Sequence, residues 1–252
     1  MLLVAVACNQ AARDIKKVAK AAVPGGPQIQ ATVVTIRTAL QPGKKITTST
    51  IVIGSDVARQ ANEIGTWRLF DVKNERVAFV DDVAKTYRYE SLKSLAATPA
   101  DPPSDGAPRA QLAVSSVRRI IMGVPATQAV VRLGGYQREV WIGLHPLIPP
   151  TLFALMDASD GSADNVLSAT RGFPLLDHAE IAYGNSKFVV DRAVLNIERK
   201  NVPEALLQIP ASYRDVTATA PAARHPGASS PPRDQRTREE GSRSSARDRT
   251  GP

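Results

Sequence analysis

The chain has 252 residues, of which 43% are hydrophobic and 5% aromatic, and its formal net charge is +8. Its single cysteine, Cys8, excludes a disulfide within the chain, so the fold must depend on a hydrophobic core. The seven Arg and four acidic residues after Val216 supply +3 of the net charge. The remaining +5 is too modest to indicate nucleic acid as a partner.

The first eight residues form an apolar run that ends in small residues and Cys8. This pattern is typical of the second half of a bacterial lipoprotein signal, in which the cysteine is acylated. The positively charged start is absent and the apolar run is short, which a start codon placed too far downstream would explain. We therefore predict that Cys8 is lipidated; a cleaved or cropped secretory signal and a chance cysteine are the alternatives.

Residues 11–23 have the spacing of an amphipathic helix. Apolar side chains recur at Ile15, Val18, Ala19 and Ala22, whereas the lysines fall on the opposite side. Such a helix either packs on a sheet or lies on a membrane surface beside the lipid anchor. No later segment approaches the roughly 20 apolar residues that a transmembrane helix needs.

Most of the following sequence predicts short β-strands joined by turns, because β-branched residues alternate with Gly, Pro and Asn clusters. Tight turns are expected at residues 41–44, 73–75, 134–135 and 184–185. The strands predicted in chain order are 29–40, 45–54, 66–72, 76–80, 85–92, 111–122, 126–133, 136–143, 179–183 and 187–198, with a short closing segment at 206–209.

Three segments interrupt this pattern. Residues 96–109 form a Pro-rich loop, which we interpret as an insertion within one sheet and not as a boundary between two domains. Residues 151–158 predict a short apolar helix, followed by a mobile polar loop over 157–169. Residues 217–252 have no large apolar side chain and are predicted to be disordered. The domains expected are 1–27 (truncated signal and helix), 28–216 (β domain) and 217–252 (tail).

Reactive groups are scarce. There is no Gly-x-Ser-x-Gly, phosphate-binding loop or Rossmann fingerprint, and His145, His178 and His225 lie far apart, so we expect no metal and no cofactor. The acidic residues Asp157, Asp160 and Asp164 miss the spacing of a calcium loop and indicate a solvated acidic loop. Asp81 and Asp82 are adjacent, so their side chains should point apart at a hairpin tip and not share a proton.

Three groups of short motifs, taken together over residues 28–216, resemble a bacterial envelope family. The first is Trp67 to Asp71, a strand over 77–80, and Lys85-Thr86-Tyr87. The second is residues 121–127 followed by the Val-Trp strand at 139–142. The third joins 172–175 (Gly-Phe-Pro-Leu), 201–203 (Asn-Val-Pro) and 209–213 (Ile-Pro-Ala-Ser-Tyr), with Ala211 where the family often has Gly.

The chain is thus similar to an uncharacterised bacterial domain related to the LolA/LolB-like and LppX-like lipoprotein carriers. That resemblance implies a mainly β (α+β) fold, a curved antiparallel half-barrel whose concave face is crossed by short helices. It also implies an apolar cavity for acyl chains and no fixed catalytic residues. The apolar residues expected to line such a cavity are Trp67, Phe70, Phe79, Tyr87, Trp141, Leu152, Phe153 and Met156.

The function expected is therefore a non-enzymatic protein of the bacterial periplasm or outer membrane that binds an apolar ligand or a lipidated partner. Its expected membrane attachment is the lipid on Cys8, and no nucleic acid is expected to bind. The alternative is a structural or interaction scaffold in which the same apolar residues fill a closed core. An enzyme of unrecognised type ranks last, because no nucleophile, acid–base pair or metal cluster is visible.

Overall fold

The computed structural model describes residues 26–43, 45–61, 65–97, 110–160, 167, 170–184 and 186–218, all within the first of two compact units, Met1–Pro221. The predicted helix at 11–23, Cys8, most of the Pro-rich loop and nearly all of the tail lie outside these residues.

The strands are β1 (Gln28–Gln41), β2 (Lys45–Ile53), β3 (Val57–Ala61), β4 (Thr66–Asp71), β5 (Arg76–Asp81), β6 (Thr86–Ser91), β7 (Gln111–Ile121), β8 (Val124–Leu133), β9 (Tyr136–Gly143), β10 (Phe173–Tyr183), β11 (Ser186–Pro203) and β12 (Arg214–Asp215). The helices are α2 (Leu92–Ala97), α3 (Leu152–Ser159) and the 3-10 turn η2 (Glu204–Leu207).

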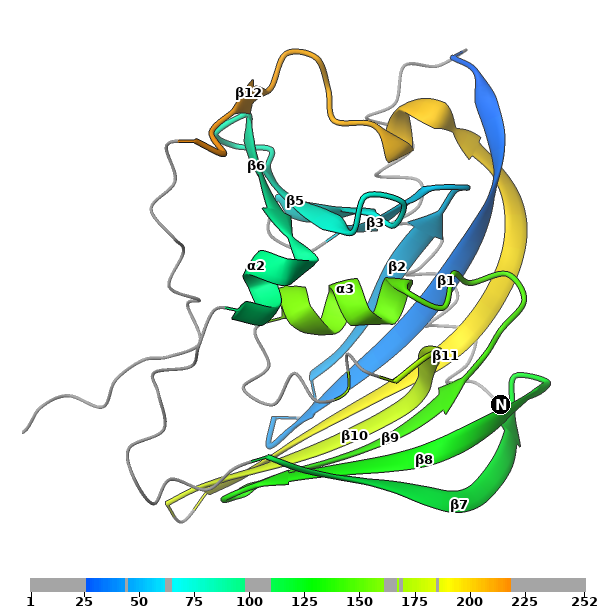
Figure 1. The fold of residues 1–252 in the computed structure, drawn as a ribbon, viewed down its shortest axis with the longest axis vertical. Coiled ribbons are helices and arrows are strands. Elements are labelled where there is room, and N and C mark those ends of the chain that lie inside the picture. Colours follow the sequence, from blue (N-terminus) through cyan, green and yellow to red (C-terminus); the bar gives the residue numbers. More distant parts are fainter. Residues whose placement is uncertain are drawn as a thin grey trace, which may run out of the picture. The chain divides into compact units, whose positions relative to one another are not determined.

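All twelve strands belong to one sheet, in the order β12-β6-β5-β4-β3-β2-β1-β11-β10-β9-β8-β7. The sheet bends strongly, so that the β3–β6 and β7–β10 ends face each other across a hollow, and α2 and α3 lie in that hollow (Figure 1). This confirms the predicted mainly β class and the curved sheet with helices on its concave face. One pairing departs from the antiparallel pattern, because β12 runs parallel to β6.

The long strands β1 and β11 lie side by side at the centre of the sheet. β1 is buried on both faces from Ala31 to Thr35, which explains its β-branched sequence, whereas most of β11 is exposed or half-buried. The two strands pair from Gln28 with Pro203 to Gln41 with Val189, with one irregularity at Thr35. Because side chains alternate across a strand, Val33 packs on one face with the residues near η2, and Val34 packs on the concave face. Within the described residues, no helix is long and apolar enough to span a membrane.

The turn predictions are confirmed where the structure describes them. Leu133 pairs with Tyr136 across Gly134, and Tyr183 pairs with Ser186 across Gly184. Both glycines have positive φ, 55° and 57°, which side chains disfavour and two-residue hairpin turns require. The turn at Pro42 and Gly43 joins β1 to β2 as expected.

Several elements differ from the sequence prediction. β12 was not expected, and β10 begins at Phe173, whereas the predicted strand begins at residue 179. β3 was not expected, because its segment Val57–Ala61 contains a single β-branched residue and has low β-propensity. It is a strand because its backbone pairs with β2 on one side and with β4 on the other. α2 occupies residues assigned to the end of a strand and a loop, and it buries Leu95 in the core.

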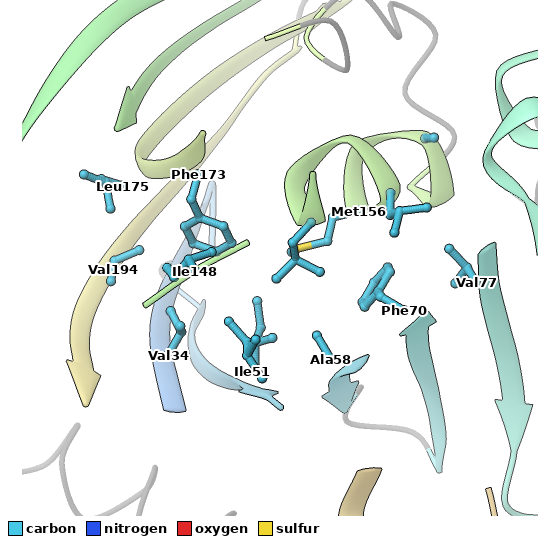
Figure 2. Packing of buried hydrophobic residues seen from close by; sticks show 14 of the residues in the cluster. Val34, Ile51, Ala58, Phe70, Val77, Ile148, Met156, Phe173, Leu175 and Val194 are labelled. Carbon is cyan, nitrogen blue, oxygen red and sulfur yellow. The ribbon is translucent and has the colours of Figure 1, made fainter. Parts of the chain in front are cut away.

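The concave face carries the main core (Figure 2). Phe70 and Val77 from the β4–β5 hairpin, Ile51 from β2 and Met156 from α3 pack together in one cluster. α3 is buried on nearly all sides, from Leu152 to Ser159, because sheet strands lie on both sides of it in the hollow. Burial on nearly all sides explains why the residues from Leu152 to Met156 are all apolar.

On the opposite face of β4–β6, the segment after η2 crosses the sheet. Asp82 accepts hydrogen bonds from Trp67 Nε1 at 2.6 Å and from Tyr213 Oη at 2.9 Å. Arg59 stacks over the Trp67 ring, with its Cζ 3.8 Å from the ring centroid. Asp81 accepts instead from the backbone amides of the adjoining turn, so the two aspartates have separate partners at a hairpin tip, as predicted.

Asp71 organises the β4–β5 turn. Its carboxylate accepts from the backbone and side-chain amides of Asn74 and from Arg76 Nε, at 2.8 to 3.1 Å. Burial alone would raise the pKa of Asp71, but the hydrogen bonds from Asn74 and Arg76 outweigh it and hold the pKa below its usual value. The stability that Asp71 contributes is therefore present above its unfolded pKa of about 3.9 and is lost as the pH falls through the lower, folded value.

We predict that Asp71→Asn lowers the free energy of unfolding at pH 7 by about 1.5–3 kcal/mol, because hydrogen bonds to a charged acceptor are lost. The difference from the unmodified protein should shrink as the pH is lowered toward 2, where Asp71 itself is neutral. Urea unfolding at several pH values measures both effects. Asp56→Asn, at an exposed aspartate just before β3, should change stability by less than about 0.5 kcal/mol at pH 7. A deficit independent of pH would contradict this role of the carboxylate.

Candidate functional site

A cavity of about 1120 Å³ begins between α3 and the central strands and continues around β2 to the groove beside η2. Its apolar lining comes from β1, β10, β11 and α3, which converge on the concave face of the sheet. These residues are Ile36, Phe153, Met156, Phe173, Leu175 and Val194. Thr38, Thr47 and Ser49 on β1 and β2 form a hydroxyl-bearing part of the wall. The cavity therefore has an apolar side and a polar side.

The cavity also continues around part of β2. β3 pairs only with Ile51, Val52 and Ile53 of β2, and the cavity lining follows the remaining residues 45–50. Beyond them it includes Val33 and Leu206, which pack together on the other face of the sheet. This part of the sheet thus connects the hollow with the groove beside η2.

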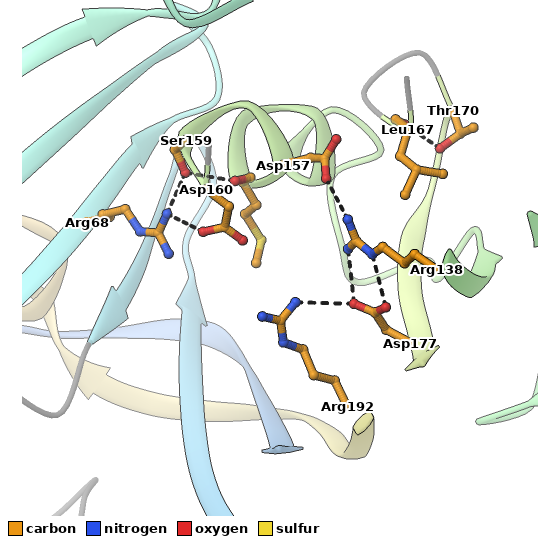
Figure 3. A network of polar contacts seen from close by, with 10 residues as sticks. Arg68, Arg138, Asp157, Ser159, Asp160, Leu167, Thr170, Asp177 and Arg192 are labelled. Atoms are coloured by element: carbon orange, nitrogen blue, oxygen red, sulfur yellow. Dashed lines mark hydrogen bonds and ion pairs between the residues drawn. The ribbon is translucent and has the colours of Figure 1, made fainter. Parts of the chain in front are cut away.

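A buried charge network forms one wall of the cavity (Figure 3). Arg138 donates to both oxygens of Asp177, at 3.0 Å each, and to Asp157 at 3.1 Å. Arg192 adds a bond of 3.2 Å to Asp177. Burial would lower the pKa of Arg138, but attraction to Asp177 and the hydrogen bonds to it outweigh burial and raise the pKa above its ordinary value. Arg138 is therefore a permanent cation that joins β9 and β10 to α3.

A second arginine lies at the C-terminal end of α3. Arg68 donates from one nitrogen to Ser159 at 2.7 Å and to Asp160 at 2.6 Å, and from another to Gln60 at 3.1 Å. The side chain is only 13% exposed, and its Nε has no hydrogen-bond partner among the described residues. Arg68 lines the cavity, so the pocket combines apolar surface with a partly satisfied guanidinium.

The structure distributes the eight predicted ligand-binding residues over different sites. Phe153 and Met156 line the cavity. Phe70 and Leu152 belong to the main core, and Phe79 and Trp141 pack against that core. Trp67 and Tyr87 lie in the separate cluster beside Tyr213.

The sequence reading missed the charged residues of the site. Arg138, Val140 and Ile142 alternate along β9 and so share one face, which places a charge among inward apolar side chains. That pattern was the available signal for a buried ion pair. The partners Asp157 and Asp177 lie in other elements and meet Arg138 only in space.

The prediction of a solvated acidic loop is wrong for Asp157. This residue belongs to α3, is 1% exposed and binds Arg138, because the helix continues to Ser159 where a loop was expected. Asp160 at the end of the helix binds Arg68, and Asp164 lies outside the described residues.

The histidines are dispersed. His178 on β10 contacts Asp191 at 2.7 Å and Glu180 at 3.2 Å, and the hydrogen bond with Asp191 is the largest of the contributions that raise its pKa. Burial lowers the pKa of His145, and His225 lies outside the described residues. In the part of the chain that the structure describes, no three His, Cys, Asp or Glu side chains are placed to hold a metal ion.

No protein-family model and no curated protein matches the chain. Solved structures with some likeness include PNGF-II, at 14% identity and a TM-score of 0.46, where the match covers 75% of this chain and 31% of PNGF-II. A LolA superfamily protein from Nitrosomonas europaea matches at 12% identity and a TM-score of 0.29, covering 79% of this chain and 97% of its own. A putative outer membrane lipoprotein-sorting protein domain from Vibrio parahaemolyticus matches at 9% identity and a TM-score of 0.27, covering 74% and 91%.

The comparisons thus include the superfamily that the sequence motifs resemble. The chain spans about a third of the length of PNGF-II. All three TM-scores lie below 0.5.

We predict that Arg138→Met destabilises the protein by about 3–5 kcal/mol, because it leaves two carboxylates buried without their shared cation. The loss should be greatest near pH 8 and smaller near pH 5, where protons can neutralise those carboxylates more easily. Chemical unfolding at both pH values measures this. Arg192→Met, at a half-exposed arginine that binds only Asp177, should cost less than about 1 kcal/mol. Equal losses for the two variants would contradict the assigned role of Arg138.

Proposed function

We propose that this chain is a non-enzymatic carrier that binds an apolar or amphiphilic molecule, such as the acyl chain of a lipid or lipidated partner. The observation that carries this proposal is the cavity of about 1120 Å³, part of which lies between α3 and the sheet. Its volume is slightly above the roughly 300–1,000 Å³ typical of ligand pockets. The proposed ligand-binding domain runs over residues 28–216, with residues 96–109 as an insertion loop.

The chemistry of the walls supports an amphiphile. Ile36 and Val194 on neighbouring strands, with Phe173 and Met156 beside them, offer apolar contacts to a hydrocarbon chain. Arg68 and Arg192 line the same cavity and offer donors to a polar head group. Such a division orients a ligand, because burying a head group against apolar side chains without hydrogen bonds is costly.

A second candidate is an interaction scaffold without a ligand. The observation that favours it is the close packing in the other part of the hollow, where Phe70, Val77, Leu95 and Leu152 are fully or almost fully buried together. If ligand uptake fails, that packed core is the main feature of the hollow. The two candidates predict opposite results in one binding experiment.

We expect that tryptophan at the cavity wall reduces ligand uptake. Ile36→Trp and Ser49→Trp place a large side chain at two positions that pair across β1 and β2 and line the cavity. Binding of a fluorescent fatty acid to delipidated protein, with native mass spectrometry for stoichiometry, should show at least a tenfold loss of affinity. The volume of an indole inside the cavity is the physical reason.

The matched control is Val83→Trp. Val83 is 85% exposed at the β5–β6 turn and is not among the residues that line the cavity. This variant should bind as the unmodified protein does. Failure of the unmodified protein to take up any fatty acid would favour the filled scaffold, and equal binding by all variants would place the ligand elsewhere.

We further propose that the protein acts in the bacterial envelope with an acyl group on Cys8. This rests on the sequence pattern at residues 1–8, which lie outside the described residues. In a bacterial host, the mature protein should gain the mass of a lipid anchor and enter the membrane fraction, and Cys8→Ala should abolish both. A protein of unmodified mass in the cytoplasm would contradict the anchor but not the cavity.

A further inference from the structure

The β7–β8 hairpin ends in exposed apolar side chains. Ile120 is 67% exposed and Met122 is 38% exposed, both close to the turn. Leu144, directly after β9, is 64% exposed. Large apolar residues that cluster at a surface indicate an interaction site, whereas isolated ones do not.

The strand register brings these residues together. Ile120 pairs with Pro125, which is exposed, and Ala126 pairs with Gly143. Continuing the second pairing by one residue places Leu144 next to Pro125, so the side chains form a row across three chain segments. We name Ile120, Met122, Pro125 and Leu144, together with the exposed Arg118 and Arg119, the hairpin-end patch.

The hairpin that carries this patch is cationic. Residues 111–133 contain three arginines and no Asp or Glu; Arg118 and Arg119 lie near the turn, and Arg132 lies at the other end, where it pairs with Gln111. Arg118 shares a face of β7 with Ile120, and Arg119 lies on the opposite face at the same end of the hairpin. An anionic surface therefore gains from the arginines without meeting a nearby carboxylate in this stretch.

The size of the patch distinguishes among partners. A stable protein interface buries about 800 Å² on each side and involves about 20–30 residues, far more than a hairpin end provides. Addition of a partner strand to β7 is disfavoured by the irregular register between Val114 and Arg118. A membrane surface needs neither a large interface nor a regular strand edge. A few apolar side chains can enter the head-group region while arginines remain at the phosphates.

We propose that the hairpin-end patch docks the protein on an anionic phospholipid surface. The occupant is the membrane itself and not the ligand of the cavity, so this proposal does not depend on the proposed carrier function. A cationic, partly apolar tip provides reversible attachment, since each arginine contributes attraction to anionic lipid that salt weakens.

The test is co-sedimentation of the full chain, purified without acylation, with phosphatidylglycerol–phosphatidylcholine vesicles and with pure phosphatidylcholine vesicles. We expect binding to the anionic vesicles that weakens with salt. Arg118→Gln/Arg119→Gln should reduce the partition coefficient at least about tenfold, since each arginine contributes about fivefold near the surface. Ile120→Ser/Leu144→Ser should reduce it by a similar factor, and circular dichroism should show that both variants are folded.

Matched changes elsewhere are the controls. Val83→Ser removes a side chain that is 85% exposed at the β5–β6 turn, and Lys73→Gln/Lys93→Gln removes two exposed cations outside the patch. Both control variants should bind as the unmodified protein does. Every variant contains the same arginine-rich tail, so the tail cannot cause a difference between them. The arginine variant decides the outcome if the serine variant fails to fold.

Three results would overturn the proposal: no binding to anionic vesicles, patch variants that bind as tightly as the unmodified protein, and losses of the same size in the controls. If the patch variants instead abolish self-association in sedimentation velocity while vesicle binding is unchanged, the surface is a protein interface and the proposal is wrong. Fatty-acid uptake by the same variants remains a separate measurement, so failure here does not decide the cavity proposal.

Discussion

The constraint on which the site depends is that a charge inside the hollow of a sheet must be paired. Arg138 points from β9 into that hollow and satisfies two carboxylates, one on β10 and one on α3. An uncompensated charge in such a place would cost several kcal/mol, so the helix and the strands are held at one separation. The cavity lies beside this network, with Arg138, Asp157 and Asp177 in its wall.

Two arginines hold the C-terminal part of α3. Arg138 binds Asp157, and Arg68 binds Ser159 and Asp160, while apolar residues of the helix pack in the main core with residues of β4 and β5. The ion pairs fix the orientation of α3, and the burial of apolar surface contributes most of the free energy that stabilises it. A short helix that would not be stable alone is therefore part of a rigid wall.

Much of the fold was predictable because its signals are local. Alternating β-branched residues mark β1 and β2, and glycines with positive φ mark the hairpins at Gly134 and Gly184. β3 gave no such signal, since its stability comes from neighbours on both sides. The cavity wall was only partly predictable: Phe153 and Met156 are apolar and close in sequence, but the contact between Arg138 and Asp177 joins positions 39 residues apart. Even there, the charge among alternating apolar residues of β9 was visible, while its partners were not.

The order of the strands has a consequence for how the chain reaches this state. Strands β1 to β6 are neighbours both in sequence and in the sheet, and the same holds for β7 to β11. Each set can therefore form from hairpins between consecutive strands as the chain is synthesised. The two ribbons are joined along the single seam between β1 and β11, whose residues are separated by most of the domain. Until that seam closes, one edge of β1 exposes its backbone and neighbouring apolar side chains. During synthesis, the unpaired edge of β1 is therefore a site at which other chains can associate, until β11 pairs with it.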